Sequence, residues 1–186
     1  SVDLTLSADT LTATGTAPAQ WIGRTSAMPT SVPGVVHLDL SGLTADFPPD
    51  VSRLRELIER ERVRFNIGSA ALLPEAWDLL RGVRDAIQDL FTQAGDLSYR
   101  TDIELLGRTD STGSNETNRV LSQLRAEAVM SALASLGVLE ENLSPSGIGT
   151  SEPVVAGSAE EAAQENRSVS FVVRLTPAGS REGERR

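Results

Sequence analysis

The sequence predicts an α/β fold of the α+β sandwich type, in which helices pack on a mixed β-sheet, preceded by a small β-β-α-β module. Segments that alternate apolar and polar residues recur along the chain, as in SVSFVVRL at residues 168–175, and this alternation is typical of strands. Between them lie segments whose apolar residues recur every three or four positions, as amphipathic helices require. The 186 residues have a hydrophobic content of 39%, which is sufficient for one or two packed domains.

The small module is expected over residues 1–45. Residues 2–15 alternate apolar and polar side chains around a polar turn, which predicts a hairpin. A short helix with Trp21 and Ile22 as its apolar anchors is expected next, followed by a strand that places His37 on its exposed side. Because a unit of this size is below the size at which a lone core is usually stable, we expect it to pack on the rest of the chain or on a missing upstream repeat.

A linker helix is expected at residues 46–62. The two prolines of ADFPPD mark a boundary, and Leu54 and Ile58 lie on one stripe of the helix that follows. The main domain is expected at residues 63–175, and the tail at residues 176–186 has the composition of a disordered segment. Within the main domain the pattern predicts a strand at 63–68, a long helix from Pro74, a strand at 102–107, a helix at 115–136, a short strand at 144–150 and a strand at 168–175.

Composition and charge exclude several kinds of site. The formal net charge of -9 argues against binding to duplex nucleic acid, whose phosphates need clustered lysine and arginine. The absence of cysteine excludes disulfides and thiolate zinc sites, and the single histidine, His37, cannot form a multi-histidine metal site. We therefore expect no metal and no cofactor.

The sequence contains no recognisable membrane-spanning or targeting segment. It has no run of about 18 apolar residues, the length that a spanning helix needs. Its N-terminus lacks the basic and apolar regions of a signal peptide. Because the chain begins at Ser1 without an initiator methionine, we expect it to be part of a longer protein whose targeting segment is missing. Contact with a membrane is expected only through segments outside this chain.

The stretch from Gly107 to Val129, GRTDSTGSNETNRVLSQLRAEAV, carries the most specific pattern. On the helix expected there, Asn118, Ser122 and Arg125 lie on one face, because they are four and three residues apart. Apolar residues flank the same face, so Arg125 is directed toward the apolar side of the helix. A buried guanidinium keeps its charge and needs a partner, because leaving it unpaired costs several kcal/mol.

Asp110, at the end of the preceding strand, is the expected partner of Arg125. Two interpretations of this pair stay open. The first is an internal salt bridge that only pins the loop to the helix. The second is a pocket in which Asp110 binds a cationic amine and Arg125 binds a carboxylate through a bidentate fork. Such a pocket would select a zwitterion.

The same stretch resembles the signature of the OmpA-like C-terminal domain family, which includes outer-membrane anchors, peptidoglycan-associated lipoproteins and flagellar stator subunits. The run GRTDSTGS followed by NRVLSQLRAEAV carries the resemblance, and the segments FNIGSAALLPEA, SPSGIGTSEPV and ENRSVSFVV agree with it in family order. The resemblance covers residues 63–175. The first 45 residues loosely resemble a BON-type module through a GTAP turn and the segment SVPGVVHLDLSGL.

The resemblance implies a non-catalytic domain that binds bacterial peptidoglycan without a covalent bond and anchors an envelope protein to the cell wall. In the family, the domain holds the diaminopimelate of the stem peptide. By position, Asp110 and Arg125 match the family's binding residues, and Asn118 and Arg167 lie at the margin of the pocket. The resemblance also implies a location in the bacterial periplasm or cell envelope, with peptidoglycan as the partner and no cofactor.

Two residues depart from the family pattern. The family often has histidine where Arg108 stands and usually has a second arginine where Ser168 stands. Arg108 adds positive charge beside Asp110 and is expected to compete for it, while Ser168 removes a contact from the wall of the pocket. Both departures concern the affinity of the site more than its identity.

Two other functions stay open at this point. One is a stator-like or dimerising interaction module of the cell envelope, in which case the chain forms a homodimer. The other is an enzyme that acts on the cell wall, with Asp102, Glu104 and Asp110 as candidates for an acid and base pair. Alternation along the strand favours a simpler explanation, in which Asp102 and Glu104 lie on its exposed side.

Overall fold

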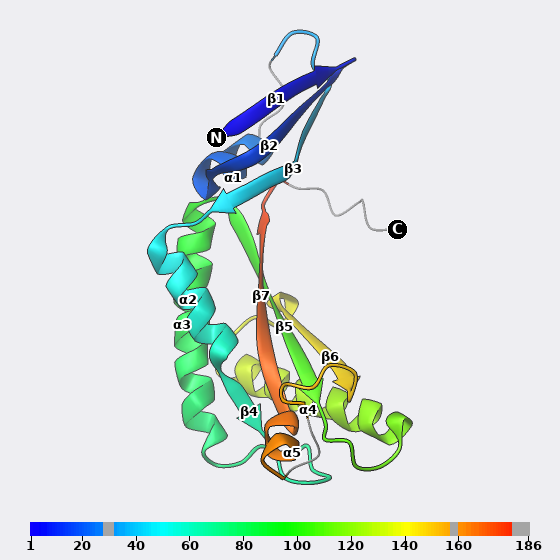
Figure 1. Ribbon diagram of the computed structural model, residues 1–186. Coiled ribbons are helices and arrows are strands. Elements are labelled where there is room, and N and C mark those ends of the chain that lie inside the picture. Colours follow the sequence, from blue (N-terminus) through cyan, green and yellow to red (C-terminus); the bar gives the residue numbers. More distant parts are fainter. Residues whose placement is uncertain (28–31, 157–159, 180–186) are drawn as a thin grey trace. The chain divides into compact units, whose positions relative to one another are not determined.

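The computed structural model describes residues 1–27, 32–156 and 160–179 (Figure 1). The contacts within it divide the chain into two compact units, each built from segments that are separate in the sequence. Unit 1 consists of Ser1–Arg53, Phe91–Thr101 and Leu175–Arg186, and unit 2 consists of Leu54–Leu90 and Asp102–Arg174.

Strands and helices are interspersed along the chain. They are β1 (Val2–Ser7), β2 (Thr10–Pro18), α1 (Ala19–Ala27), β3 (His37–Asp46), α2 (Pro49–Arg60), β4 (Arg62–Arg64), α3 (Ala76–Asp96), β5 (Tyr99–Arg108), α4 (Asn115–Ser135), the 3-10 helix η1 (Glu140–Asn142), β6 (Leu143–Gly149), α5 (Glu160–Asn166) and β7 (Ser168–Pro177). Every strand and helix that the sequence predicts is present, while η1 and α5 are additional. The predicted mixed α/β fold class is confirmed.

Unit 1 contains a three-stranded sheet in the order β1-β2-β3, with β1 antiparallel and β3 parallel to β2. The β-β-α-β order predicted for this segment is confirmed, and Figure 1 shows its strands side by side. His37 is exposed, as predicted, and it begins β3, which continues to Asp46, beyond its predicted end. The resemblance of this segment to a BON-type module stays a prediction.

The core of unit 1 is completed by residues far along the chain. Ile22 of α1 packs with Ala94 of α3 and Tyr99 of β5 in one buried cluster. The Phe47 ring meets the Tyr99 ring edge to face, with centroids 5.0 Å apart. The expected packing of the small module on the rest of the chain is therefore confirmed. The prediction that Trp21 is a second anchor is wrong: Trp21 is 44% exposed, because neighbours on a helix point about 100° apart.

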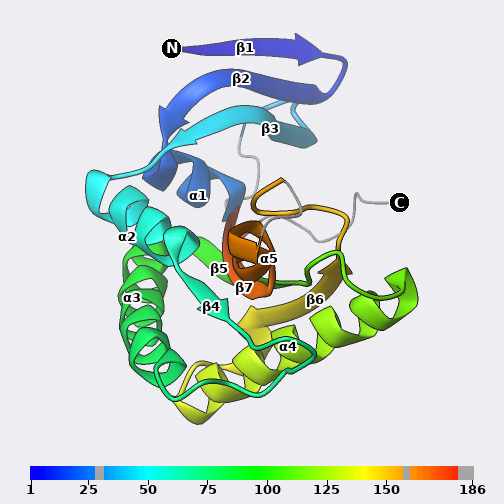
Figure 2. The same cartoon turned by 60° about the horizontal axis from the view of Figure 1, so that its bottom comes forward.

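Unit 2 contains a four-stranded mixed sheet in the order β4-β7-β5-β6. β4 pairs antiparallel with β7, and β5 pairs parallel with β6. A parallel pair needs a crossover connection, and α4 lies in that connection and runs alongside β6 in Figure 2. The buried apolar residues of this unit come from helices and strands alike and include Leu80, Ile87, Ile103, Leu105, Val129, Leu133 and Phe171.

Two glycines allow α4 to lie close to the sheet. A Cβ atom on Gly107 of β5 would lie 2.0 Å from the carbonyl oxygen of Ser122, and one on Gly147 of β6 would lie 2.3 Å from the backbone nitrogen of Gln123. Both contacts are with helix backbone, so relieving them would require the helix to move. The close approach also lets the Gly149 N–H donate to the Ser122 hydroxyl at 2.9 Å.

Gly107→Ala is expected to lower the free energy of unfolding by about 1–3 kcal/mol, because overpacking forces backbone shifts that cost about this much. Gly82→Ala is the matched control, since Gly82 lies in α3 and a Cβ atom there meets nothing within 4 Å. The control is expected to stabilise the protein by about 0.5–1 kcal/mol, because alanine has the higher helix propensity. Urea denaturation measures both changes. Equal midpoints for the two variants would contradict the close approach of α4 to β5.

Two elements around β7 differ from the sequence predictions. The sequence predicted no helix where α5 lies, and only Ala162 and Asn166 of its seven residues are buried, so it lacks an apolar stripe. The strand predicted at 63–68 is shorter, because β4 ends at Arg64. One further backbone bond continues the contact with the chain before β7, since the Phe65 N–H donates to the Arg167 carbonyl at 2.8 Å.

The first residues of the tail that was predicted as disordered, 176–186, have an ordered structure. β7 continues to Pro177. The Ala178 N–H then donates to the Ser98 carbonyl at 2.8 Å, within unit 1. The remainder of the predicted tail, residues 180–186, lies outside the described residues.

Candidate functional site

Asp110 lies in the loop that follows β5. The Thr109 N–H donates to the Gly149 carbonyl at 3.0 Å, which ties this loop to the end of β6. The Thr112 N–H donates to Asp110 Oδ1 at 3.0 Å, so the loop itself holds the carboxylate in place. The loop ends at Ser114, whose hydroxyl accepts a backbone N–H of the first turn of α4 and caps the helix. The position of Asp110 is therefore set from both sides.

Arg167, between α5 and β7, forms the ion pair with Asp110. Arg167 Nη1 donates to Asp110 Oδ2 at 2.9 Å, and the two side chains are only 8% and 12% exposed. On the other side, Arg167 Nη2 donates to Glu160 Oε1 at 2.8 Å, and the Glu160 side chain is 74% exposed. One guanidinium thus bridges a buried carboxylate and an exposed one.

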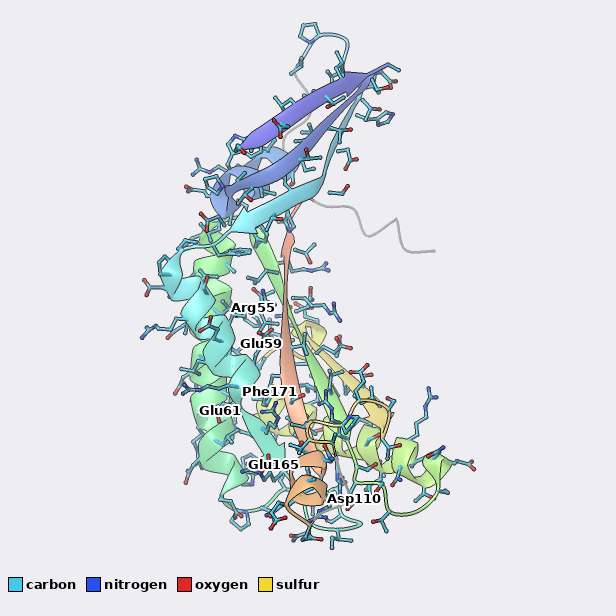
Figure 3. The ribbon with its side chains drawn as sticks, in the orientation of Figure 1. Arg55, Glu59, Glu61, Asp110, Glu165 and Phe171 are labelled. Carbon is cyan, nitrogen blue, oxygen red and sulfur yellow. The ribbon has the colours of Figure 1, made fainter. Side chains whose placement is uncertain are left out.

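These three side chains line a pocket of about 390 Å³ in unit 2, a volume within the usual range for small-molecule sites. Figure 3 labels Asp110 and Glu165, which come from the loop after β5 and from α5 and lie at the same end of the sheet. The lining of the pocket consists of Ile67, Thr109, Asp110, Ser111, Thr112, Thr150, Pro153, Ala156, Glu160, Ala163, Asn166 and Arg167. The pocket therefore combines charged groups with apolar walls.

The pKa of Asp110 reflects burial and hydrogen bonding in opposition. Burial is the largest single influence and would raise the pKa of the carboxyl. The hydrogen bonds from Arg167 and Thr112, together with the positive charge of Arg167, outweigh it, so that the pKa lies below its ordinary value. The pKa of Arg167 is raised, first by its hydrogen bond to Glu160 and then by the one to Asp110. Both members of the pair are therefore charged at neutral pH.

The lowered pKa of Asp110 predicts how its ion pair responds to acid. The pair contributes stability above the unfolded pKa of about 4 and loses this contribution as the pH falls through the lower folded pKa. We expect the difference in unfolding free energy between the wild type and Asp110→Asn to be constant from about pH 7 to pH 5 and to shrink below about pH 4. Urea denaturation across this range measures the difference. A difference that grows toward acid pH would contradict the lowered pKa.

Arg125 is fully buried and joins two segments beside the pocket. Its guanidinium donates to three backbone carbonyls: Nε to Ser69 at 2.8 Å, Nη1 to Arg108 at 2.9 Å and Nη2 to Asn66 at 3.0 Å. The Cζ atom lies 5.3 Å from the centre of the Phe65 ring, which is within the range of a cation–π contact. Burial lowers the pKa of Arg125 to about 10, so the guanidinium stays charged at neutral pH.

The predicted inward orientation of Arg125 is confirmed, but its partners differ from those expected. Among the described residues, no salt bridge joins Asp110 to Arg125; the ion-pair partner of Asp110 is Arg167. The Arg125 guanidinium was expected to bind a ligand through a bidentate fork. Instead it donates to backbone carbonyls on both sides of Ile67 and at the end of β5. Arg125 is not among the residues that line the pocket. In this geometry it supports the segments that carry the pocket residues.

Asn118 is also buried, at 4% exposure, and does not line the pocket. Its Nδ2 has no hydrogen-bond partner among the described residues, and the same is true of the buried atoms Thr109 Oγ1 and Arg167 Nε. Buried polar atoms are normally paired. Thr109 and Arg167 line the pocket, and the unpaired atoms of both side chains are themselves buried.

The two departures from the family pattern have clear positions. Arg108 Nε donates to the Glu152 carbonyl at 2.7 Å, and its Nη1 donates to the Ser170 hydroxyl at 2.5 Å. The prediction that Arg108 competes for Asp110 is therefore wrong, because its donors are directed to other partners. Ser168 is fully buried, and its hydroxyl donates to the Glu165 carbonyl at 2.6 Å. This bond pairs a carbonyl in the last turn of α5.

The pocket includes residues that sequence reasoning missed, among them Ile67, Thr109 and Glu160. Thr109 neighbours Asp110 in the motif, and that adjacency was a usable signal. Ile67 lies in a segment predicted as strand, yet it is 70% exposed beside the pocket. Glu160 lies in α5, whose polar sequence gives no periodicity from which to predict a helix.

Several kinds of site and segment are absent from the described residues. Within 1–27, 32–156 and 160–179, no group of three or more histidine, aspartate or glutamate side chains is placed to hold a metal ion. Over the same ranges, no helix has the length and apolar character needed to cross a membrane. Glu104 pairs with Arg174, and neither Glu104 nor Asp102 lines the pocket of Asp110. The three carboxylates considered for catalysis are therefore not assembled in this pocket.

Two curated relatives resemble the chain over different lengths. The probable lipoprotein YiaD of Escherichia coli strain K12 is 32% identical over 111 residues, which is 60% of this chain and 47% of that protein. The peptidoglycan-binding protein ArfA of Mycobacterium tuberculosis strain H37Rv is 27% identical over 177 residues, which is 89% of this chain and 52% of that protein. The chain thus spans about half the length of these relatives.

Solved structures and a family-wide sequence pattern agree with the fold. The peptidoglycan-associated lipoprotein from Burkholderia pseudomallei matches with a TM-score of 0.55 at 28% identity, over 63% of this chain and 93% of that one. The C-terminal domain of Helicobacter pylori MotB matches with a TM-score of 0.54 at 25% identity, over 61% of this chain and 84% of that one. The pattern of the OmpA family matches residues 64–167, a segment that contains Asp110, Asn118, Arg125 and Arg167. Because this match covers more than half of the chain, the chain belongs to the OmpA family.

Proposed function

We propose that residues 64–167 bind bacterial peptidoglycan without a covalent bond, through the diaminopimelate of the stem peptide, and so anchor an envelope protein to the cell wall. The observation that carries this proposal is the buried pair of Asp110 and Arg167, 2.9 Å apart, in a pocket of about 390 Å³. The free end of the diaminopimelate side chain carries an ammonium and a carboxylate. A pocket with one fixed carboxylate and one guanidinium offers a partner to each.

Asp110 binds the ammonium group of the ligand. An ionised carboxylate has about four acceptor positions. The Thr112 N–H and Arg167 occupy two of them, and the Thr112 side chain donates to the carboxylate as well. The position that remains accepts a hydrogen bond from the ligand ammonium.

Arg167 binds the carboxylate of the ligand. A guanidinium has five N–H donors, and the described contacts of Arg167 use one on Nη1 and one on Nη2. Nε is buried without a partner among the described residues. The partner of Nη2, Glu160, is exposed, so Arg167 can exchange it for the carboxylate of the ligand while it keeps its bond to Asp110.

Arg125 and Asn118 complete the site as positioning residues. Arg125 donates to the carbonyls of Asn66 and Ser69 in one segment and of Arg108 in another. These residues stand next to the pocket residues Ile67 and Thr109 in the sequence. Asn118 lies on the same buried face of α4 as Arg125. In this proposal neither Arg125 nor Asn118 contacts the ligand. Both lie behind the residues that do, and they keep the geometry of the pocket fixed.

The names of two relatives support the cell wall as the partner. ArfA is described as a peptidoglycan-binding protein, and the Burkholderia pseudomallei structure as a peptidoglycan-associated lipoprotein. A location in the bacterial periplasm or cell envelope follows from this proposal, because peptidoglycan lies there. The affinity for one stem peptide is modest, since a small ligand in an open pocket buries little surface. Many copies attached to one wall give firm attachment.

Co-sedimentation with purified cell wall tests the proposal. We expect the chain to sediment with a diaminopimelate-type wall more than with a lysine-type wall, because the lysine side chain lacks the carboxylate that Arg167 binds. The wall should release no soluble fragments, since the domain binds without turnover. Equal sedimentation with both walls would contradict the role of diaminopimelate. Failure to sediment with either wall would contradict peptidoglycan binding.

A further inference from the structure

We infer that Glu160 occupies the position at Arg167 that the ligand's carboxylate takes, and that this competition sets how strongly the pocket prefers diaminopimelate over lysine. The inference rests on the proposed function of the pocket. Arg167 Nη2 donates to Glu160 Oε1 at 2.8 Å, and Glu160 is one of the residues that line the pocket. A carboxylate of the protein therefore lies where a carboxylate of the ligand is expected.

The two carboxylates that bind Arg167 differ in how firmly the rest of the protein holds them. The Asp110 side chain is 12% exposed and also accepts the Thr112 N–H. The Glu160 side chain is 74% exposed, and Arg167 is its one side-chain partner within the described part of the chain. On the Glu160 side of this pair water screens the charge, and ordering the long, exposed side chain costs entropy. Glu160 is therefore the partner that a ligand displaces, while Asp110 stays in place.

The charges of the pocket make this displacement selective. A lysine side chain brings only an ammonium, which Asp110 binds whether or not Glu160 remains on Arg167. Diaminopimelate also brings a carboxylate, which must replace Glu160 to reach Arg167 and otherwise meets it as a like charge. The apparent affinity of a ligand falls in proportion to the fraction of protein in which its site is free. Glu160 thus weakens the binding of diaminopimelate and does not weaken the binding of lysine.

Glu160→Gln removes the competing charge with little change in shape, and Glu161→Gln is the matched control. Glu161 is the next residue of α5 and is exposed, so its substitution removes the same charge from the same helical turn. The probes are two synthetic stem tripeptides that differ only in their third residue, which is diaminopimelate in one and lysine in the other. Isothermal titration of the full chain measures the affinity of each variant for each peptide.

Glu160→Gln is expected to bind the diaminopimelate peptide about three- to tenfold more tightly than the wild type, a gain of the size that an exposed ion pair allows. The lysine peptide should bind no more tightly than before. Glu161→Gln should leave both affinities within about twofold, because a solvated charge outside the pocket is screened by salt. The ratio of the two affinities therefore rises in Glu160→Gln alone.

Three results would overturn the inference: equal tightening for both peptides, the same gain in Glu161→Gln, or weaker binding of diaminopimelate by Glu160→Gln. The first two would indicate a general charge effect, and the third would indicate that Glu160 itself binds the ligand. The proposed function is judged by other results in the same experiment, because it requires that the wild type bind the diaminopimelate peptide and that Asp110→Asn not bind it. If those two results hold and the affinity ratio does not change in Glu160→Gln, only the inference fails.

Discussion

Asp110→Asn is expected to lower the affinity for a diaminopimelate peptide by at least about 100-fold. The amide has nearly the same shape as the carboxylate, but it carries no charge and presents a donor in place of one acceptor. The ligand ammonium loses charge-assisted hydrogen bonds worth about 1.5–3 kcal/mol each, and each 1.4 kcal/mol corresponds to about a tenfold change in affinity. Arg167 also loses its buried partner. Isothermal titration of the peptide measures the loss.

The control for this substitution is Asp89→Asn. Asp89 is an exposed residue of α3 and does not line the pocket, so the same change of charge should leave binding within about twofold. Because breaking a buried ion pair can destabilise a protein by about 3–5 kcal/mol, circular dichroism must accompany the titration. Asp110→Glu provides a second variant, which keeps the charge and is expected to bind weakly. Full binding by folded Asp110→Asn would show that the pocket is misplaced.

Local periodicity was sufficient to predict the helices and strands that have an amphipathic pattern. The long helix α3 and the alternating strand β7 were predicted because each shows one apolar side to a core. The same reasoning missed α5, in which only Ala162 and Asn166 are buried. It also misjudged Trp21, because the choice between Trp21 and Ile22 as the buried residue depends on the phase of a nine-residue helix. The cluster around Tyr99, which completes the core of unit 1, involves contacts that no local pattern contains.

The sequence predicted the direction in which Arg125 points, but it did not predict how the candidate site residues pair. The helical spacing placed Arg125 on the buried face of α4, and the structure agrees. The partner of Asp110 is Arg167, which is 57 positions away in the sequence. These residues meet because β7 lies next to β5 in the sheet, and sheet order cannot be read from spacing along one helix. The partners of Arg125 are backbone carbonyls, which every residue carries, so no sequence signal distinguishes them.

Arg125→Lys is expected to lower the free energy of unfolding by about 2–6 kcal/mol. The guanidinium donates to three carbonyls that belong to two separate segments. A lysine ammonium is a compact charge on a flexible chain and cannot reproduce this planar fork. If it bonds one carbonyl, two others lose their donor, and each buried acceptor left unpaired costs about 1–3 kcal/mol. The lysine charge also lies in a buried position with fewer partners, which adds to the destabilisation.

Arg119→Ala is the control for this substitution, because Arg119 lies on the same helix and is exposed. Its removal should change the free energy of unfolding by no more than about 0.5 kcal/mol. Urea denaturation of the wild type and both variants gives the comparison. It also separates two roles for Arg125, since a residue that only contacts the ligand would leave the stability of the free protein nearly unchanged.

Binding by the folded fraction of Arg125→Lys is the second measurement. Titration of the diaminopimelate peptide is carried out at a temperature where the variant is folded by circular dichroism. We expect the affinity to fall by about tenfold or more, since the carbonyls of Asn66, Ser69 and Arg108 lose the group that holds them together and a pocket misplaced by even about 1 Å binds poorly. Loss of stability together with loss of binding supports the positioning role. A variant as stable as the wild type that nevertheless fails to bind would instead assign Arg125 a direct contact with the ligand.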